Sequence, residues 1–469
     1  MERFRRKFQV ANPAFHAACH AVRKLKQAGF EAGLVGGSVR DLLLGRLPAD
    51  YDLVTTAVPE VLAELFPGQR SVGVSFGVSL IEVEGIRFEA ATAREERNYL
   101  DGRHPELVRY TDSLELDMAR RDFTVNALWY DPETEEVCDC VGGVADLERG
   151  VLRTVGDPEE RFREDYLRML RAVRFAARLG FELSPGTRRA IAELAPLTAE
   201  LAPERVAGEL TRMLTGPAPD RAMRLLLELG LLRAVLPEVA ALDGVEQPPQ
   251  FHPEGDVFTH TMKMLAHMAY PDARLAWSVL LHDIAKPQTQ SIDETGRIRF
   301  FGHESEGAEL AGRILDRLRF STADREAIVQ AVRGHMRFAS VREMRAAKLR
   351  RLLADPNFPQ ELELHRLDCI ACHGFLECFV YLLDELVERR RRGEETALPE
   401  RWVTGKSLIA AGCRPGPEFG PLLESIYDRQ LAGEFAGPAE ALAPGVAAWN
   451  SPTCRQGKTA AENRGAAGR

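Results

Sequence analysis

The pattern of apolar and polar positions changes near residue 151. Before that point, short apolar stretches such as residues 32–35 and 78–83 predict buried strands, with helices between them. Beyond residue 151 the pattern becomes almost wholly helical, and residues 151–155 are the last expected strand. The fold class predicted from this order is α+β, with a mixed sheet and its helices first and all-α segments afterwards.

Breakers and composition divide the chain further. Residues 216–219 and 247–249, rich in proline and glycine, mark the expected joints. We expect a lead-in helix within residues 1–29 and one continuous helix over residues 161–180. The stretch from residue 443 onward has little periodicity and is expected to be disordered. The predicted segments are residues 1–150, 151–247, 248–390, 391–442 and the tail 443–469.

A glycine turn follows the first apolar strand. Residues 32–35 lead into Gly36, Gly37 and Ser38, which open a helix that is apolar on one face and ends at Gly45. Free backbone amides and the helix dipole at such a turn favour a phosphate. The glycine spacing fits neither a Walker A loop nor a dinucleotide fingerprint, so both are set aside.

Three carboxylates come after this turn, namely Asp50, Asp52 and Glu89. On an extended segment, side chains two positions apart face the same side, so the pair Asp50 and Asp52 could share Mg²⁺. Two such ions can hold an attacking hydroxyl and a leaving pyrophosphate in line. An Asp-x-Asp pair also fits a solvated turn, and the preceding anion site favours nucleotidyl transfer.

The order of these motifs resembles a known family. Residues 36–45 followed by 50–52 look like the first motif of the class II tRNA nucleotidyltransferases and bacterial poly(A) polymerases. Further matches follow in order at Glu89 with Thr92 and Arg94, and at residues 101–105, 120–128 and 161–175. Together they cover roughly residues 30–185. The resemblance implies a nucleotidyltransferase palm over residues 1–150 and a helical neck and body over residues 151–247.

The resemblance also implies a role for each matching residue. Asp50 and Asp52 would hold Mg²⁺, assisted by Glu89. The nucleotide would be bound by Gly36, Gly37, Ser38, Arg40, Arg121, Asp122, Asn126, Glu164, Asp165 and Arg168. Asp165 and Arg168 are taken to read the base edge of CTP or ATP without a nucleic-acid template. From the residues themselves, Arg120 to Asp122 are expected to cap a helix that begins at Phe123.

Composition bounds the partners and the compartment. The formal net charge of −9 argues against a globally basic nucleic-acid binder but leaves room for a local RNA footprint. The best candidate footprint is Arg171, Arg174 and Arg178, which share one helix face. Eight cysteines are too few for a disulfide scaffold, no apolar run approaches a membrane span, and no signal-peptide core is seen. We therefore expect a cytoplasmic protein with no membrane association.

A second set of metal-binding residue types lies beyond residue 251. It is similar to the HD phosphohydrolase superfamily, whose ligands match His260, His282, Asp283 and Asp368. His303 and His335 match the additional histidines of binuclear members, and Lys286 matches the basic residue after the HD pair. Imidazoles and carboxylates together suit a divalent metal such as Mn²⁺, Ni²⁺ or Co²⁺. His252 and His267 are not at matching positions, and residues 391–442 are expected to be a helical module.

The predicted function is that of a tRNA nucleotidyltransferase that adds or repairs the 3′-terminal CCA of tRNA with CTP, ATP and Mg²⁺. The resemblance implies that the HD segment could act as a 2′,3′-cyclic phosphodiesterase or phosphatase on damaged tRNA ends. Poly(A) polymerase and enzymes adding only CC or only A stay open as alternatives, although residues 94–108 match a loop that CC-only enzymes are expected to lack. A different class, an HD phosphohydrolase with a non-catalytic RNA-binding front half, also stays open.

Overall fold

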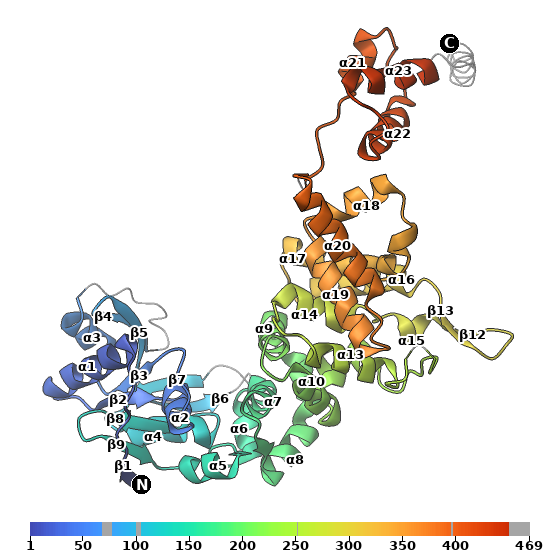
Figure 1. The fold of residues 1–469 in the computed structure, drawn as a ribbon. Coiled ribbons are helices and arrows are strands. Elements are labelled where there is room, and N and C mark those ends of the chain that lie inside the picture. The colour runs from blue at the N-terminus through green and yellow to red at the C-terminus, as the bar shows by residue number, and fades with distance from the viewer. Residues whose placement is uncertain (68–76, 100–104, 251, 395–396, 450–469) are drawn as a thin grey trace, which may run out of the picture.

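The computed structural model describes residues 1–67, 77–99, 105–250, 252–394 and 397–449. A mixed sheet with its helices lies at one end of an elongated molecule, and helical segments follow one another towards the C-terminus (Figure 1). This arrangement confirms the predicted α+β class. No helix within the described residues combines the length and the apolar character needed to cross a membrane.

A seven-stranded mixed sheet forms the scaffold of the first segment. Its strands are β1 (Glu2–Arg5), β2 (Ala32–Val35), β3 (Asp52–Thr55), β4 (Val78–Val83), β5 (Ile86–Thr92), β8 (Leu128–Asp131) and β9 (Glu136–Asp139), in the order β1-β9-β8-β2-β3-β5-β4. Only the β3 and β5 neighbours run parallel, with Leu53 opposite Ala90. This register sets Asp52 beside Glu89, because each precedes its paired residue by one position.

Helices and a hairpin surround this sheet. They are α1 (Pro13–Gln27), α2 (Gly37–Leu43), α3 (Pro59–Leu65), the hairpin of β6 (Arg94–Tyr99) and β7 (Pro105–Tyr110), α4 (Leu114–Ala119), the 3₁₀ helix η2 (Thr124–Asn126) and α5 (Gly143–Arg149). The predicted lead-in helix occupies only α1, since residues 2–5 instead form β1 against β9. The helix expected to begin at Phe123 is wrong, because a single 3₁₀ turn there leads directly into β8. The matched residues 101–104 lie outside the described part of the chain.

The next segment is helical with one small ladder. Its elements are β10 (Val151–Leu152), α6 (Pro158–Glu164), α7 (Leu167–Leu179), β11 (Glu182–Leu183), α8 (Pro185–Leu194), the 3₁₀ helix η3 (Ala195–Glu200), α9 (Pro203–Leu214), α10 (Pro219–Glu228), α11 (Leu231–Val235) and α12 (Pro237–Ala240). The single helix predicted over residues 161–180 is wrong. Asp165 is extended, with φ −152°, and its carboxylate accepts from the Leu167 N–H at 3.0 Å, which starts α7 separately.

The remaining segments are also mainly helical. They comprise α13 (Val257–Ala266), α14 (Ala273–Leu281), α15 (Lys286–Thr289), β12 (Gln290–Ile292), β13 (Ile298–Phe300), α16 (His303–Arg317), α17 (Thr322–Gly334), the 3₁₀ helix η4 (His335–Glu343), α18 (Ala346–Leu353), α19 (Phe358–Ala371), α20 (Glu377–Arg391), α21 (Gly405–Ala410), α22 (Phe419–Leu431) and α23 (Pro438–Trp449). The prediction that residues 151–155 form the last strand is wrong, because strands β11, β12 and β13 follow them. Residues 443–449 are helical, against the expectation of disorder, and the predicted tail beyond them lies outside the described residues.

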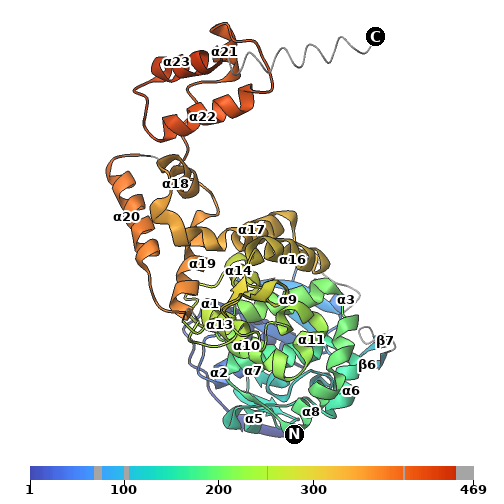
Figure 2. The same ribbon diagram turned by 90° about the vertical axis from the view of Figure 1, so that its right-hand side faces the viewer.

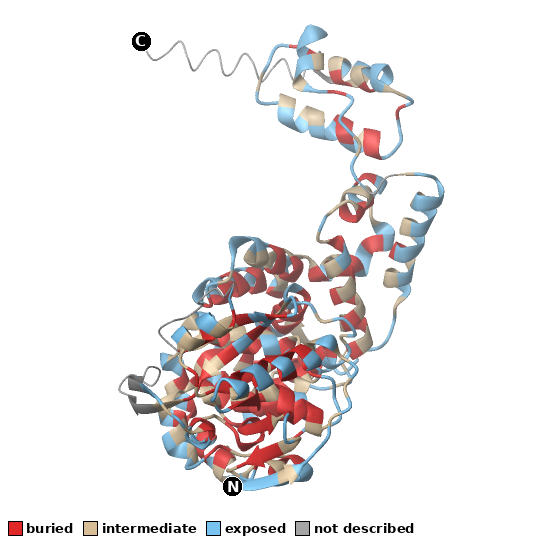
Figure 3. Ribbon diagram, turned by 90° about the vertical axis from the view of Figure 1, so that its left-hand side faces the viewer, coloured by how far each residue is buried: buried red, intermediate tan, exposed pale blue. Residues whose placement is uncertain are grey.

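Buried side chains join most of these segments. One cluster of buried residues runs from Phe15 to Ala371 and so spans the sheet, the α6–α12 segment and the helices up to α19. Figure 3 shows these buried positions concentrated in the larger body of the molecule. Helices α21–α23 stand apart at the far end and have a separate small core around Leu408 and Ile426 (Figure 2).

Candidate active site

The glycine turn between β2 and α2 is shaped by tight contacts. Gly36 has φ 72°, a left-handed conformation that favours glycine, and an added Cβ would lie 3.2 Å from Arg121 Nη1. The Ser38 hydroxyl donates to the Val35 carbonyl at 3.0 Å, so its side chain is engaged within the turn. Arg40 is buried and donates to Asn126 Oδ1 at 2.6 Å. These side chains hold the turn, which leaves backbone groups to face a phosphate.

The three predicted carboxylates lie close enough to repel one another. Asp52 begins β3 and is partly buried, whereas Asp50 before it and Glu89 on β5 are exposed. Burial and the charges of Asp50 and Glu89 together raise the pKa of Asp52 to about 6, against the opposing charge of Arg121. Crowded carboxylate oxygens of this kind fit a divalent cation, since such an ion would relieve their repulsion.

An arginine-rich pocket of about 330 Å³ lies beside this turn. Its lining residues are Arg120, Arg121, Asp122, Asp165, Leu167, Arg168, Arg171 and Arg205. Asp122 accepts a forked pair of hydrogen bonds from Arg171, at 2.9 and 2.6 Å. Burial alone would raise the pKa of Asp122, but the charge and hydrogen bonds of Arg171, the charge of Arg168 and the Phe123 N–H together outweigh it and lower that pKa. The structure thus brings Arg121, Asp122 and Arg168 to one concave surface.

The predicted base-reading residues lie at the break between α6 and α7. Glu164 accepts from Arg168 Nη1 at 2.5 Å, although the helix is broken between them. The Asp165 carboxylate accepts from Arg205 Nη2 at 2.8 Å, and Asp165, Arg168 and Arg205 all line the same pocket. No sequence pattern near Arg205 on α9 indicated that it would contact Asp165. Its contact depends on the extended backbone at Asp165.

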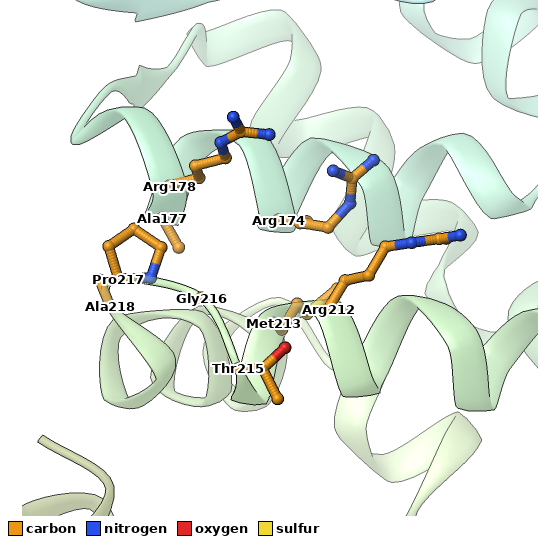
Figure 4. A pocket seen from close by; sticks show the side chains of 9 residues that line it. All are labelled: Arg174, Ala177, Arg178, Arg212, Met213, Thr215, Gly216, Pro217 and Ala218. Carbon is orange, nitrogen blue, oxygen red and sulfur yellow. The ribbon is translucent and has the colours of Figure 1, made fainter. Parts of the chain in front are cut away.

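The three predicted RNA-binding arginines on α7 divide between different partners. Arg171 is held by Asp122, and Arg174 Nε donates to the buried Glu209 at 2.6 Å. Arg178 is about half exposed, with 46% of its side chain accessible. Further along α7, Arg174 and Arg178 face Arg212 of α9 across a second pocket of about 240 Å³ (Figure 4).

The predicted HD residues gather in one buried group. His282 Nε2 lies 3.0 Å from Asp283 Oδ2, and His260 Nε2 lies 3.2 Å from Asp368 Oδ1. On the other side of Asp283, His303 Nε2 is 3.5 Å from Asp283 Oδ1 and 3.2 Å from His335 Nε2. Helices α13 and α19, the end of α14, and the starts of α16 and η4 supply these side chains.

The histidines of this group are oriented by their outer nitrogens. The Nδ1 atoms of His282, His303 and His335 lie 2.6–2.8 Å from the carbonyls of Val279, Phe300 and Val332. A carbonyl can only accept, so each Nδ1 donates and each neutral imidazole turns a lone pair on Nε2 towards the group. Among the described residues, the Nε2 atoms of His260 and His282 are buried and lie 3.2 and 3.0 Å from carboxylate oxygens of Asp368 and Asp283, but outside hydrogen-bonding geometry. This donor set fits one or two divalent metal ions.

Further polar residues border this group. Lys286 Nζ lies 2.7 Å from Asp283 Oδ2, at the edge of a pocket of about 530 Å³. His252, Glu254 and Cys372 lie against His260. The sequence pattern placed His252 outside the matching HD positions and gave no indication of Glu254. Their grouping could not be predicted from the spacing of residues, because Cys372 lies far along the chain from His252 and Glu254.

Family models match three regions of this chain. Residues 32–153 match the poly A polymerase head domain, and residues 180–242 match the family described as probable RNA and SrmB-binding site of polymerase A. Residues 257–370 match the HD domain. A solved structure of the Bacillus stearothermophilus CCA-adding enzyme in complex with CTP is similar over 96% of this chain and all of that chain, with TM-score 0.70 and 26% identity.

Curated relatives give the same result. The CCA-adding enzyme of Geobacillus kaustophilus is 46% identical over 229 residues, which are 49% of this chain and 56% of that protein, so the chain spans about half the length of this first relative. The CCA-adding enzyme of Bacillus licheniformis is 37% identical over 316 residues, which are 66% of this chain and 72% of that protein. The chain belongs to the CCA-adding enzyme family.

Proposed function

We propose that this chain is a tRNA nucleotidyltransferase that adds or repairs the 3′-terminal CCA of tRNA with CTP and ATP. The observation that carries the proposal is the position of the acidic group Asp50, Asp52 and Glu89 beside an arginine-lined pocket at the same glycine turn. The named relatives and the similar structure with CTP support it.

Each residue near this turn has a distinct part in the proposed reaction. Asp50 and Asp52 would hold Mg²⁺, which when bound lowers the pKa of the attacking hydroxyl and neutralises the leaving pyrophosphate. Arg121 reaches the turn from the arginine-lined pocket and would meet the triphosphate. Because no side chain acts as a nucleophile here, positioning and charge neutralisation would supply most of the rate.

Base selection would use the paired residues at the break between α6 and α7. Arg168, fixed by Glu164 at 2.5 Å, offers donors to a base edge, and Asp165, anchored by Arg205, offers an acceptor. Opposite hydrogen-bond polarity at two adjacent positions is what discrimination of nucleotides without a template requires. The second pocket, with Arg178 and Arg212, would receive backbone phosphates of the tRNA.

One assay tests this function. Purified full-length chain is incubated with tRNA lacking its 3′ end and with CTP alone, ATP alone, or both, and the products are sized. Addition of CC with CTP and of CCA with both is expected, whereas long A tracts, CC only, or A only would identify one of the alternatives. Asp50→Ala should abolish incorporation, and incorporation retained by that variant would refute the proposed metal role.

A second activity is proposed for the HD group. Its buried imidazoles and carboxylates, with the Nε2 atoms of His260 and His282 facing Asp368 and Asp283, support hydrolysis of a 2′,3′-cyclic or terminal phosphate at a tRNA end. Release of phosphate from 2′,3′-cyclic AMP with Mn²⁺, Ni²⁺ or Co²⁺ is expected, and it should be lost in His282→Ala. Absence of hydrolysis with every one of these ions would refute the proposal, and so would hydrolysis retained by that variant.

The cytoplasmic location expected from the sequence belongs to the same proposal, because the proposed substrates are tRNA and free nucleotides. Cell fractionation with an antibody to the chain would test it. Recovery in the soluble cytoplasmic fraction is expected, and recovery with membranes would contradict it.

A further inference from the structure

A thiol, a carboxylate and an imidazole meet just outside the HD group. His252 Nδ1 lies 2.9 Å from Glu254 Oε1 and 3.4 Å from Cys372 Sγ. His252 and Glu254 come from the loop before α13, and Cys372 lies at the C-terminal end of α19. His260 stands between this cluster and the HD group, because its Nδ1 contacts Glu254 Oε1 at 2.7 Å while its Nε2 faces Asp368.

Glu254 carries a buried oxygen that these contacts leave unused. Its side chain is 0% exposed, and Oε1 takes both imidazole contacts. Within the described residues, Oε2 is buried and has no hydrogen-bond partner. An unpaired buried carboxylate oxygen costs desolvation energy, so it points to a ligand that would satisfy it.

The distances around Cys372 suit a metal. Its Sγ lies 3.4 Å from His252 Nδ1, the nitrogen–sulfur pair of this cluster. The same thiol also donates to Asp368 Oδ1 at 3.5 Å and lies 3.6 Å from His260 Nδ1, at the border of the HD group. In a tetrahedral zinc site, bonds of about 2.0 to 2.3 Å separate neighbouring ligand atoms by about 3.5 Å. His252 and Cys372 also line the pocket of about 530 Å³, so an ion could enter from solvent.

We propose that His252, Glu254 and Cys372 form a separate site for a thiophilic divalent cation such as Zn²⁺, next to the HD metal group. Cys372 would bind as thiolate, with its proton released to solvent, and Glu254 would bind through Oε2. His252 would bind through Nδ1 with its single proton on Nε2, so the ion would replace the contact of Nδ1 with Glu254 Oε1. Glu254 Oε1 would still accept from His260 Nδ1, so the ion would fix the carboxylate that orients His260. The site does not depend on whether the HD group hydrolyses phosphates.

Cobalt spectroscopy of the full chain tests this site directly. The protein is stripped with a chelator and titrated with Co²⁺, whose bond to a thiolate gives a charge-transfer band in the near ultraviolet. The wild-type chain should show the band, Cys372→Ser should lose it, and His252→Ala should weaken the associated Co²⁺ binding at least tenfold. Cys369→Ser is the matched control, since Cys369 Sγ lies 3.7 Å from His365 Nε2 and is outside the cluster.

The outcomes separate this site from the HD group. Asp283→Asn should keep the band, and its loss in that variant would show that the thiolate binds only as part of the HD group. Absence of the band in the wild type at saturating Co²⁺, its survival in Cys372→Ser, or its loss in Cys369→Ser would each overturn the proposal. Should Cys372→Ser fail to fold, alkylation of the wild-type chain decides the matter, because Zn²⁺ must slow modification of Cys372 and an unchanged rate would overturn the site.

Discussion

Replacement of Asp52 by asparagine should stabilise the metal-free protein at neutral pH. Burial, together with the charges of Asp50 and Glu89, raises the pKa of Asp52 from 3.8 to about 6. One pKa unit corresponds to about 1.4 kcal/mol, so the ionised carboxylate costs the folded chain at most about 3 kcal/mol. Solvent screening of this partly exposed group reduces the expected gain in Asp52→Asn to about 1–2 kcal/mol.

The sign of the effect fixes its pH dependence. The folded chain holds the Asp52 proton more tightly than the unfolded chain does, so the wild type loses stability as pH rises from about 4 to about 6. The advantage of Asp52→Asn should therefore be full at pH 7.5 and about half as large at pH 5, by the same linkage relation. Addition of Mg²⁺ should remove most of it, because the cation neutralises the carboxylate in the wild type.

Thermal unfolding with a chelator present measures this gain. Because one buried cluster joins residues 15 to 371, the melting temperature of the whole unit should rise by about 1–3 °C at pH 7.5. Asp146→Asn is the control of opposite sign, because buried Asp146 is paired with Arg149 at 2.8 Å and Arg153 at 2.7 Å and its neutralisation should destabilise the chain. A melting temperature for Asp52→Asn at or below that of the wild type at pH 7.5, or a gain independent of pH, would refute the reasoning.

Three other substitutions test the site more directly. Gly36→Ala should lower nucleotide incorporation at least tenfold, through backbone strain and contact of the added Cβ with Arg121. Gly45→Ala is its control, because Gly45 has φ 69° and nothing lies within 4 Å of an added Cβ, so only strain should act there. Equal losses of incorporation in the two variants would contradict the contact with Arg121. Arg168→Lys keeps the charge but loses the planar fork, so the ratio of CTP to ATP incorporation should change several-fold, and an unchanged ratio in competition assays would exclude base reading. Arg178→Ala should raise the KM for tRNA several-fold at unchanged KM for CTP, and an unchanged tRNA KM would remove this pocket from the RNA path.

Local patterns were sufficient for the glycine turn and its strand. Residues 32–35 form β2 and residues 37–43 form α2, as the apolar stretch and the Gly36-Gly37-Ser38 sequence predict. Short apolar runs with clear turn residues carry their own conformational preference, so no distant contact is needed to specify them. The same holds for His282 and Asp283, which are adjacent in sequence and so reach the HD group together.

Contacts between residues far apart in sequence determine the structure of the elements that were predicted wrongly. Phe123 forms an isolated antiparallel β-bridge with Thr154, and the buried Thr124 hydroxyl donates to Asp146 at 2.6 Å. The segment after Asp122 therefore pairs with residues further along the same chain and does not form a helix. Likewise Asp165 leaves helical geometry and pairs with Arg205 on α9. Apolar periodicity is the same in a continuous and in a broken helix, which is why the sequence pattern could not distinguish them.

Packing across the predicted joint at residues 247–249 links the two proposed sites. Trp277 of α14 is fully buried and donates through Nε1 to Thr211 of α9 at 2.9 Å, and the Phe258 N–H donates to the Leu242 carbonyl at 3.2 Å. Helices α13 and α14, which carry His260 and lead into His282, therefore pack on α10 and α9, and these two helices also contact α7 with its arginines. Because these contacts belong to one buried cluster, a fragment ending at residue 247 would leave the faces of α9 and α10 open to water. Helices α21–α23 have a small cluster of their own around Leu408 and Ile426, but Tyr427 and Leu431 of α22 are also buried against Ala347 of α18. Their removal would therefore uncover Ala347 while leaving the large cluster covered.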